Sequence, residues 1–381
     1  MVTAARQESS VTPLLLVPQF GQGNPEVEEL FKRGVAAHRG GQYAKAEAAY
    51  RRVLENQPDL PETYNNLGAL LAHTGRVAEA EKQYRTALKQ RPNQPEVYSN
   101  LGVLLAEAER YAEALVAYRK AAELGYAPAS YNLGNLLVRM GRDRKAEAAY
   151  RKALKLDPKL SQAHLNLGNV LEQRTEHLEA EKEYRKALEN RPDYAVALHN
   201  LSRLLVSAGR FGEAENPLRR LVALCPNDPE AHSLLGVALA ATGASVDALQ
   251  EFEAAYEHRL QLPDKGASLY RAWAALLLQE GIKAISSRGV TETEKWINAF
   301  VDLQRRAKRD RMVSVVGQAA KEAKASIPQD GQAALKAFLL GVKLFGVEDP
   351  WEAWDALAEE VSKRWPKDRS AVDVIREQRD R

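Results

Sequence analysis

Apolar residues recur along this chain at the three- and four-residue spacing of amphipathic helices, with polar residues between them. The stretch YNNLGALLAHTGR covers residues 64–76. Its Leu67, Leu70 and Leu71 share one helical face, and Gly75 ends the pattern. A second amphipathic pattern follows at once and ends at a proline. The two patterns together predict a helical hairpin.

The same hairpin pattern recurs along about two-thirds of the chain. Its Leu-Gly pair advances by 34 residues from Gly68 to Gly102 and again from Gly134 to Gly168, and by 32 residues between these two pairs. A fixed period of this length is typical of solenoid proteins. Seven copies are traced, beginning near Val27, Pro61, Pro95, Ala127, Ser161, Ala195 and Pro229.

These hairpins resemble the tetratricopeptide repeat (TPR), a helix-turn-helix unit of 34 residues with small, large and proline positions in fixed places. The resemblance covers residues 27–262. It implies an all-α, right-handed superhelical solenoid of about seven repeats with a concave inner wall. A glycine inside a helix costs about 1 kcal/mol relative to alanine. We therefore expect Gly68 and its equivalents to lie where paired helices cross, and the recurrent tyrosines to fill the space toward the next repeat.

The rest of the chain is predicted to form an arm and a helical extension. Residues 1–26 are rich in proline and glycine and lack periodicity, which indicates a flexible N-terminal arm. Its apolar stretch PLLLVPQF has three readings: a partner-binding peptide, a peptide that docks on its own chain, or a cover for the apolar edge of the first repeat. Residues 263–381 keep helical patterns without the 34-residue period, and predict an all-helical cap or bundle.

Composition narrows the class of function. The formal charge of +3 is nearly balanced, and Cys225 is the only cysteine, so an internal disulfide and a cysteine-based zinc cluster are excluded. No apolar stretch approaches the roughly 20 residues of a membrane span. Phosphate-loop, nucleophile-elbow and zinc-protease motifs do not occur. We expect a cytoplasmic, non-catalytic protein that uses no cofactor or metal and does not associate with membranes.

One asparagine recurs immediately before the Leu-Gly pair, and we call the five copies the asparagine row: Asn66, Asn100, Asn132, Asn166 and Asn200. In the TPR family this position can face the concave wall. The row is similar to the asparagine ladder of the O-linked N-acetylglucosamine transferase superhelix, although the residues after 262 are too few for that enzyme's catalytic domain. An asparagine amide both donates and accepts, so it can pair with a peptide backbone without reading sequence.

The structural alternative is that these asparagines only form local hydrogen bonds. Asn135 and Asn169 lie about one turn further along the same face and extend the predicted surface. Tyr131 and His199 continue the wall as a mixed rather than cationic surface. The predicted peptide-binding residues are Asn66, Asn100, Asn132, Asn135, Asn166, Asn169, Asn200, Tyr131 and His199.

The leading hypothesis is a scaffold or adaptor that binds an extended peptide or partner protein in the TPR groove. The family's carboxylate-clamp mode fits badly, because Phe31 and Val35 occupy its leading positions in the first repeat. One alternative is a regulatory subunit that docks an enzyme through its C-terminal bundle. A less favoured alternative is a nucleic-acid binder that uses the basic stretch from Arg305 to Arg311, which lacks interleaved aromatic residues.

Overall fold

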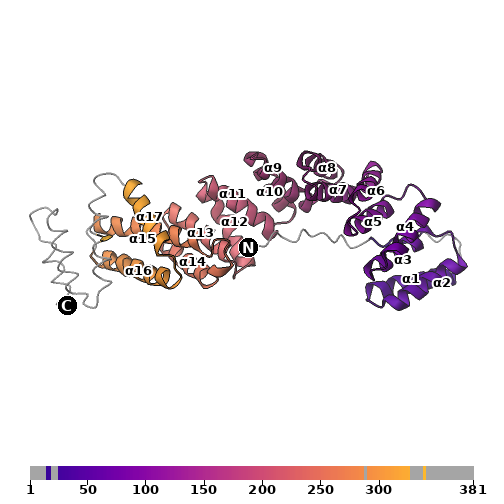
Figure 1. Ribbon diagram of the computed structural model, residues 1–381, viewed down its shortest axis with the longest axis horizontal. Helices are drawn as coiled ribbons and strands as arrows, with labels where there is room; N and C mark the ends of the chain where they lie inside the picture. Colours follow the sequence, from indigo (N-terminus) through magenta and orange to yellow (C-terminus); the bar gives the residue numbers. More distant parts are fainter. Residues whose placement is uncertain (1–13, 19–24, 287–289, 327–337, 340–381) are drawn as a thin grey trace, which may run out of the picture. The chain divides into compact units, whose positions relative to one another are not determined.

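The computed structural model describes residues 14–18, 25–286, 290–326 and 338–339. Within these ranges it contains seventeen α-helices and one short 3-10 helix, and no strand (Figure 1). The predicted all-α solenoid class is therefore confirmed. Contacts divide the chain into two compact units, Val2–Ala197 and Leu198–Arg381.

The first unit contains five hairpins, in each of which an A helix packs against the B helix that follows it. The A helices are α1 (Pro25–Arg39), α3 (Pro61–His73), α5 (Pro95–Glu107), α7 (Ala127–Arg139) and α9 (Ser161–Gln173). The B helices are α2 (Tyr43–Asn56), α4 (Val77–Gln90), α6 (Tyr111–Glu123), α8 (Asp143–Leu156) and α10 (His177–Asn190).

The second unit begins within α11, and in it α12 packs against α13, α13 packs against α14, and three packed helices follow. The helices of the sixth and seventh repeats are α11 (Ala195–Ser207), α12 (Phe211–Leu224), α13 (Pro229–Thr242) and α14 (Ser245–Glu257). The 3-10 helix η1 (Arg259–Gln261) leads to α15 (Ala267–Ser286), α16 (Val290–Arg309) and α17 (Val313–Ser326). None of the helices in the described ranges is both long and apolar enough to cross a membrane.

Six of the seven predicted repeat starts coincide with the first residue of an A helix, and the first repeat starts two residues early, at Pro25. Pro61, Pro95 and Pro229 stand at first helical positions, where the missing N–H would have no partner in the helix. The predicted boundaries at residues 26 and 262 stay a prediction. Residues 1–13 and 19–24 of the predicted arm, and residues 327–337 and 340–381 of the predicted bundle, lie outside the described residues.

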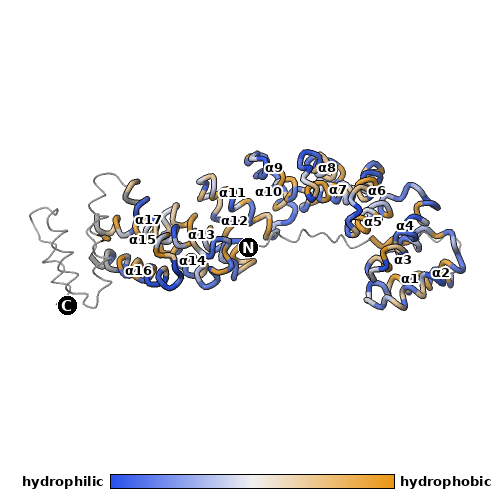
Figure 2. Tube along the Cα trace, in the orientation of Figure 1, coloured by the Kyte–Doolittle hydropathy of each residue, from blue (hydrophilic) through white to orange (hydrophobic). Residues whose placement is uncertain are grey.

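Hydrophobic and hydrophilic positions alternate along the repeat helices (Figure 2). In six of the seven repeats, a glycine of the A helix lies against an aromatic ring of the B helix. A Cβ atom added at Gly68 would lie 2.9 Å from Tyr84 Cδ1, and one at Gly134 would lie 2.4 Å from Tyr150 Cε1. The recurrent tyrosine therefore packs on the glycine of its own repeat, at the crossing of the paired helices. Tyr84 is fully buried and Tyr150 almost so.

The sixth repeat lacks both the glycine and the aromatic ring of this contact. It has Ser202 in place of the glycine, and Leu218 in place of the ring. Both side chains are fully buried. Where the A helix has a serine in place of the glycine, the B helix has a leucine in place of the larger aromatic ring. This is expected of a contact with no spare volume.

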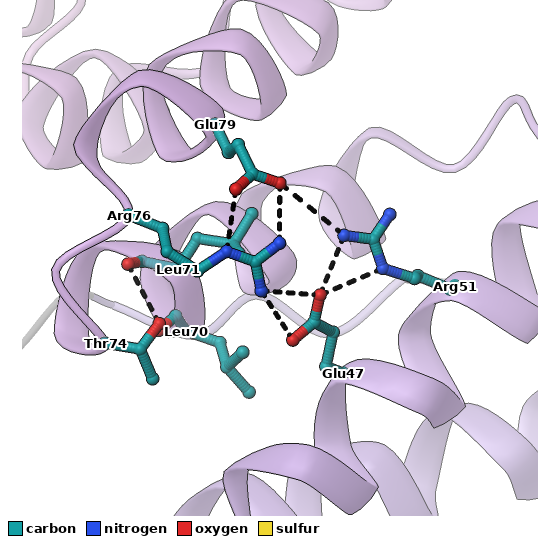
Figure 3. Close-up of polar contacts among 7 residues, drawn as sticks. All are labelled: Glu47, Arg51, Leu70, Leu71, Thr74, Arg76 and Glu79. Atoms are coloured by element: carbon teal, nitrogen blue, oxygen red, sulfur yellow. Dashed lines mark hydrogen bonds and ion pairs between the residues drawn. The ribbon is translucent and has the colours of Figure 1, made fainter.

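Alternating arginines and glutamates join successive B helices at their N-terminal ends. Between α2 and α4, Arg76 donates to both carboxylate oxygens of Glu47 at 2.8 Å, and donates to Glu79 at 2.6 and 2.7 Å (Figure 3). Arg51 donates to the same Glu47 carboxylate at 2.7 and 3.0 Å. Glu79, in the first turn of α4, therefore takes part in an ion pair as well as standing at a helix N-terminus.

The network repeats one hairpin further on, where Arg110 donates to Glu81 and Glu113 at 2.6 and 2.7 Å. The hydrogen bonds from Arg110 lower the pKa of Glu81. Exposed pairs of this kind contribute about 0.2–1 kcal/mol each. They supplement the packing of neighbouring repeats and do not replace it.

The turn after each A helix requires a left-handed residue, which is glycine in most hairpins. Gly75 and Gly141 have φ values of +78° and +67°. Glu109 and Thr175 take the equivalent positions with φ of 59° and 61°. A β-branched residue such as Thr175 is strained in this region.

We predict that Gly134→Leu lowers the melting temperature, since its Cβ would displace the Tyr150 ring. Overpacking of this kind destabilises by about 1–3 kcal/mol or more. Gly212→Leu is the matched control, because no heavy atom lies within 4 Å of its added Cβ. Melting curves followed by circular dichroism give the comparison, and equal melting temperatures for the two variants would contradict the ring-on-glycine packing.

We predict that Thr175→Gly stabilises the protein by about 1 kcal/mol, because glycine takes φ of 61° without steric strain. The reverse change at an equivalent turn, Gly141→Thr, should destabilise it by a similar amount. Urea denaturation measures both differences. A loss of stability in Thr175→Gly would show that this turn is not strained.

Candidate functional site

The asparagine row lies on A helices, two residues before the glycine that contacts the aromatic ring, or before Ser202 in the case of Asn200. In the first unit, Asn66, Asn100 and Asn132 have only 0%, 4% and 6% of their surface exposed. Buried amides need hydrogen-bond partners, because an unpaired buried donor or acceptor costs about 1–3 kcal/mol. The partners of these three side chains therefore show what the row does.

Asn66 on α3 pairs with the main chain of Leu16 in the N-terminal arm. Its Oδ1 accepts from Leu16 N at 2.7 Å, and its Nδ2 donates to Leu16 O at 2.8 Å. One asparagine amide thus binds both polar groups of one residue, as in the pairing predicted for an extended peptide.

Asn100 on α5 pairs with Leu14 in the same way. Its Oδ1 accepts from Leu14 N at 3.1 Å, and its Nδ2 donates to Leu14 O at 3.1 Å. We call residues 14–18 the docked segment. The sequence left three readings open for this apolar stretch, and the hydrogen bonds correspond to docking on its own chain.

Asn65 completes the site, and sequence analysis did not predict it. Its Nδ2 donates to Leu14 O at 2.9 Å, and its Oδ1 accepts from Asn100 Nδ2 at 2.9 Å. Asn65 is fully buried. The available signal was the double asparagine in YNNLG, since the equivalent positions of the next two repeats are Ser99 and Tyr131.

The segment and the repeats share a register of two residues per repeat. Leu14 is bound from the third repeat and Leu16 from the second, so the segment runs against the order of the repeats. In an extended chain, alternate residues present their polar groups and side chains to the same side. Successive asparagines can therefore bind every second residue of one extended peptide.

The next member of the row, Asn132 on α7, has an open donor. Its Nδ2 is buried and has no hydrogen-bond partner in the described part of the chain. This amide is the position at which the register of the docked segment would continue toward the fourth repeat.

The remaining predicted asparagines of the first unit form local hydrogen bonds. Asn166 Nδ2 donates to Asn135 Oδ1 at 2.9 Å, and Tyr150 OH donates to the same Asn135 oxygen at 2.8 Å. Asn169 Oδ1 accepts from Tyr184 OH at 2.9 Å. For these side chains the geometry favours the structural alternative, although their role in binding stays a prediction.

Tyr131 and the second-unit candidates are placed as follows. Tyr131 is almost fully buried, and its hydroxyl accepts from Asn166 Nδ2 at 3.3 Å. His199 lies 3.5 Å from a Glu230 oxygen, and this contact lowers the pKa of Glu230. Asn200 is half-buried on α11. None of these three pairs with the docked segment in the hydrogen bonds described above.

Five hydrogen bonds tie the docked segment to the three asparagines. Each contributes about 0.5–1.5 kcal/mol net. Ordering one residue of backbone costs about 1–2 kcal/mol, so five residues cost an amount of the same order. The hydrogen bonds and the ordering cost are thus of the same order, and the partly buried Leu15, Leu16 and Pro18 add to the free energy of docking.

Two buried histidines, His164 and His232, have structural partners. His164 Nδ1 lies 2.6 Å from Glu183 Oε2, and its Nε2 lies 3.0 Å from Pro158 O. His232 repeats the arrangement with Glu251 at 2.6 Å and Pro226 O at 2.9 Å. Each ring connects an A helix, its B helix and the preceding turn. At His232 the hydrogen bond with Glu251 raises the pKa of the imidazole.

Some residues of the basic stretch from Arg305 to Arg311 form contacts between the C-terminal helices. Asp310 accepts from Arg259 at 2.5 and 2.8 Å and from Tyr270 OH at 2.6 Å. Arg306 lies over the rings of Tyr256 and Trp273, with its guanidinium carbon 4.9 and 5.3 Å from their centroids. These contacts join α16 to α14 and α15, which reduces the number of cations left for phosphates.

The repeat geometry agrees with comparisons to known families. Models of the tetratricopeptide repeat match residues 31–95, 65–128 and 131–195, and a further such model matches residues 171–238. These matches span more than half of the chain. The protein belongs to the tetratricopeptide repeat family.

Solved structures of TPR proteins resemble the chain. The C-terminal part of a TPR repeat-containing protein from Cytophaga hutchinsonii is 15% identical over 63% of this chain and 99% of its own, with a TM-score of 0.51. PilF from Pseudomonas aeruginosa is 22% identical over 54% of this chain and 95% of its own, with a TM-score of 0.47. YrrB, described as a TPR protein with an unusual peptide-binding site, is 22% identical over 48% and 95%, with a TM-score of 0.40. These likenesses concern the fold, and no curated protein matches the chain.

We predict a pH-dependent stability from His232. The hydrogen bond with Glu251 raises its pKa above the ordinary 6.5. Because the folded protein then holds the proton more tightly than the unfolded chain, the stabilisation is fully present below about pH 6.5 and is lost as pH rises through the raised pKa. Glu251→Gln should therefore be less stable than the wild type at pH 6, and the difference should narrow by pH 9.

Denaturant midpoints at the two pH values measure this effect. Glu253→Gln, an exposed glutamate on the same helix, is the control and should show no such narrowing. A wild-type advantage over Glu251→Gln that grows with pH would contradict the assignment.

Proposed function

We propose that this TPR protein is a non-catalytic scaffold or adaptor that binds an extended segment of a partner protein along α3, α5 and α7. The observation that carries the proposal is the bidentate pairing of Asn66 with Leu16 and of Asn100 with Leu14. Both pairings use only main-chain groups of the bound segment. A groove with this property accepts many sequences, provided that the ligand is extended.

The binding atoms are arranged before any partner arrives. Asn65, Asn66 and Asn100 are held by one another as well as by the segment, through Asn65 Nδ2 to Asn66 Oδ1 at 3.2 Å and Asn100 Nδ2 to Asn65 Oδ1 at 2.9 Å. Their side chains are buried, so few rotamers are open to them. Preorganisation of this kind lowers the entropy lost on binding.

The alternatives are supported less well. A regulatory subunit that docks through the C-terminal bundle draws in part on residues 327–337 and 340–381, which lie outside the described ranges. A nucleic-acid binder would use the basic stretch, of which Arg306 and Arg309 already contact Tyr256. A cytoplasmic location is proposed because the single cysteine forms no internal disulfide that would need an oxidising compartment.

We predict that the triple variant Asn66→Ala, Asn100→Ala, Asn132→Ala loses peptide binding. The probe is an array of twelve-residue peptides of varied sequence, with the best binders measured in solution by fluorescence anisotropy. Two hydrogen bonds per asparagine, at about 0.5–1.5 kcal/mol each, amount to a loss of about 3 kcal/mol or more, which is more than about a hundredfold in Kd.

Asn169→Ala is the matched control, because that amide bonds to Tyr184 and should leave the Kd unchanged. Lys308→Ala with Arg305→Ala tests the nucleic-acid alternative, and should also leave peptide binding unchanged. A folded triple variant that binds at full strength would refute the groove and favour the C-terminal bundle. A triple variant that unfolds would show that the asparagines are structural.

A further inference from the structure

We propose that residues 14–18 are a tethered competitor: they occupy the peptide site in the resting protein, and a partner peptide binds only by displacing them. This inference rests on the proposed function. It adds that the site is regulated from within the chain and that its ligand must match the register of the docked segment.

The competition follows from the hydrogen-bond capacity of the site. Asn100 Nδ2 has two protons, which go to Leu14 O and Asn65 Oδ1. Asn65 Nδ2 also has two, which go to Leu14 O and Asn66 Oδ1. An amide nitrogen donates twice and no more. A second extended peptide therefore cannot pair with these groups while the segment is docked.

The side chains of the docked segment are only partly buried. Its Leu14 and Val17 side chains remain 43% and 68% exposed, whereas Leu15 and Leu16 are half-buried and Pro18 is buried, so only part of the segment contributes apolar burial. Six residues separate Pro18 from Pro25, where α1 begins. A short tether of this length gives an effective concentration in the mM range. The segment therefore excludes weak ligands and yields to stronger ones.

The proline of the docked segment, Pro18, fits the same register. Leu14 and Leu16 each donate an N–H, and Pro18, two residues further on, has none to donate. The aligned position of the first repeat holds Lys32, which pairs with Glu28 at 2.6 Å, in place of an asparagine. A proline thus stands at the step where the repeats provide no asparagine.

At the other end of the register, beyond Asn100, a longer ligand can form an additional hydrogen bond. Asn132 Nδ2 is the next buried donor along the row and lacks a partner among the described residues. A ligand in the same register reaches it with the residue two positions before the one at Asn100. We therefore expect ligands of at least five extended residues, with no proline at the three alternate positions that face Asn132, Asn100 and Asn66.

The test releases the segment without altering the repeats. Leu14→Pro with Leu16→Pro removes both donated N–H groups, whereas Leu15→Pro with Val17→Pro keeps them and is the matched control. The probe is a fluorescein-labelled synthetic peptide of residues 10–19, SVTPLLLVPQ, added to each full-length protein. Circular dichroism melts establish that the three proteins share one solenoid stability.

We expect the Leu14→Pro, Leu16→Pro protein to bind the probe about tenfold more tightly than the wild type and the control, equivalent to about 1.4 kcal/mol of docking. Adding Asn66→Ala to the released protein should remove this gain. Equal and measurable affinity in the wild type and the released protein would overturn the tethered competitor and leave the peptide groove intact. Absence of binding by all three proteins would overturn the groove as well.

Discussion

The contact of an aromatic ring with a glycine sets the spacing of the paired helices in six of the seven repeats. Tyr84 on Gly68 and Tyr150 on Gly134 leave no room for a Cβ, so each A helix lies close to its B helix in a fixed orientation. The asparagine row stands two residues before these glycines. A contact that fixes the hairpin therefore also fixes the position of a polar side chain in each repeat, which connects the stability of the stack to its binding surface.

This coupling explains how a repeat protein can bind a peptide without reading its side chains. Hairpins of constant geometry place asparagine amides at a constant interval, and an extended chain places its own amides at an interval of two residues. In the second and third repeats the two intervals match, as the pairs with Leu16 and Leu14 demonstrate. The buried position of the amides makes such pairing favourable, because an unpaired amide there is costly.

The sequence predicted the repeats well because their pattern is local and repeated. Helix starts at Pro61, Pro95 and Pro229 follow from proline chemistry at first helical positions. It did not predict which asparagines pair where, because a single position in the repeat supports two outcomes. Asn100 binds the docked segment, whereas Asn166 bonds to Asn135, which also accepts from the Tyr150 hydroxyl. The docking of residues 14–18 was one of three readings, since an extended segment without periodicity carries no signal for its partner.

The most direct test of this account is amide hydrogen exchange at the docked segment of the full-length protein, resolved residue by residue by NMR. The account predicts slow exchange at Leu14 and Leu16, whose N–H groups pair with Asn100 and Asn66, and fast exchange at Leu15 and Val17. In Asn100→Ala, protection at Leu14 should fall to that of an unfolded peptide. Equal, fast exchange at all four amides in the wild type would contradict the pairing of the asparagine row with an extended backbone.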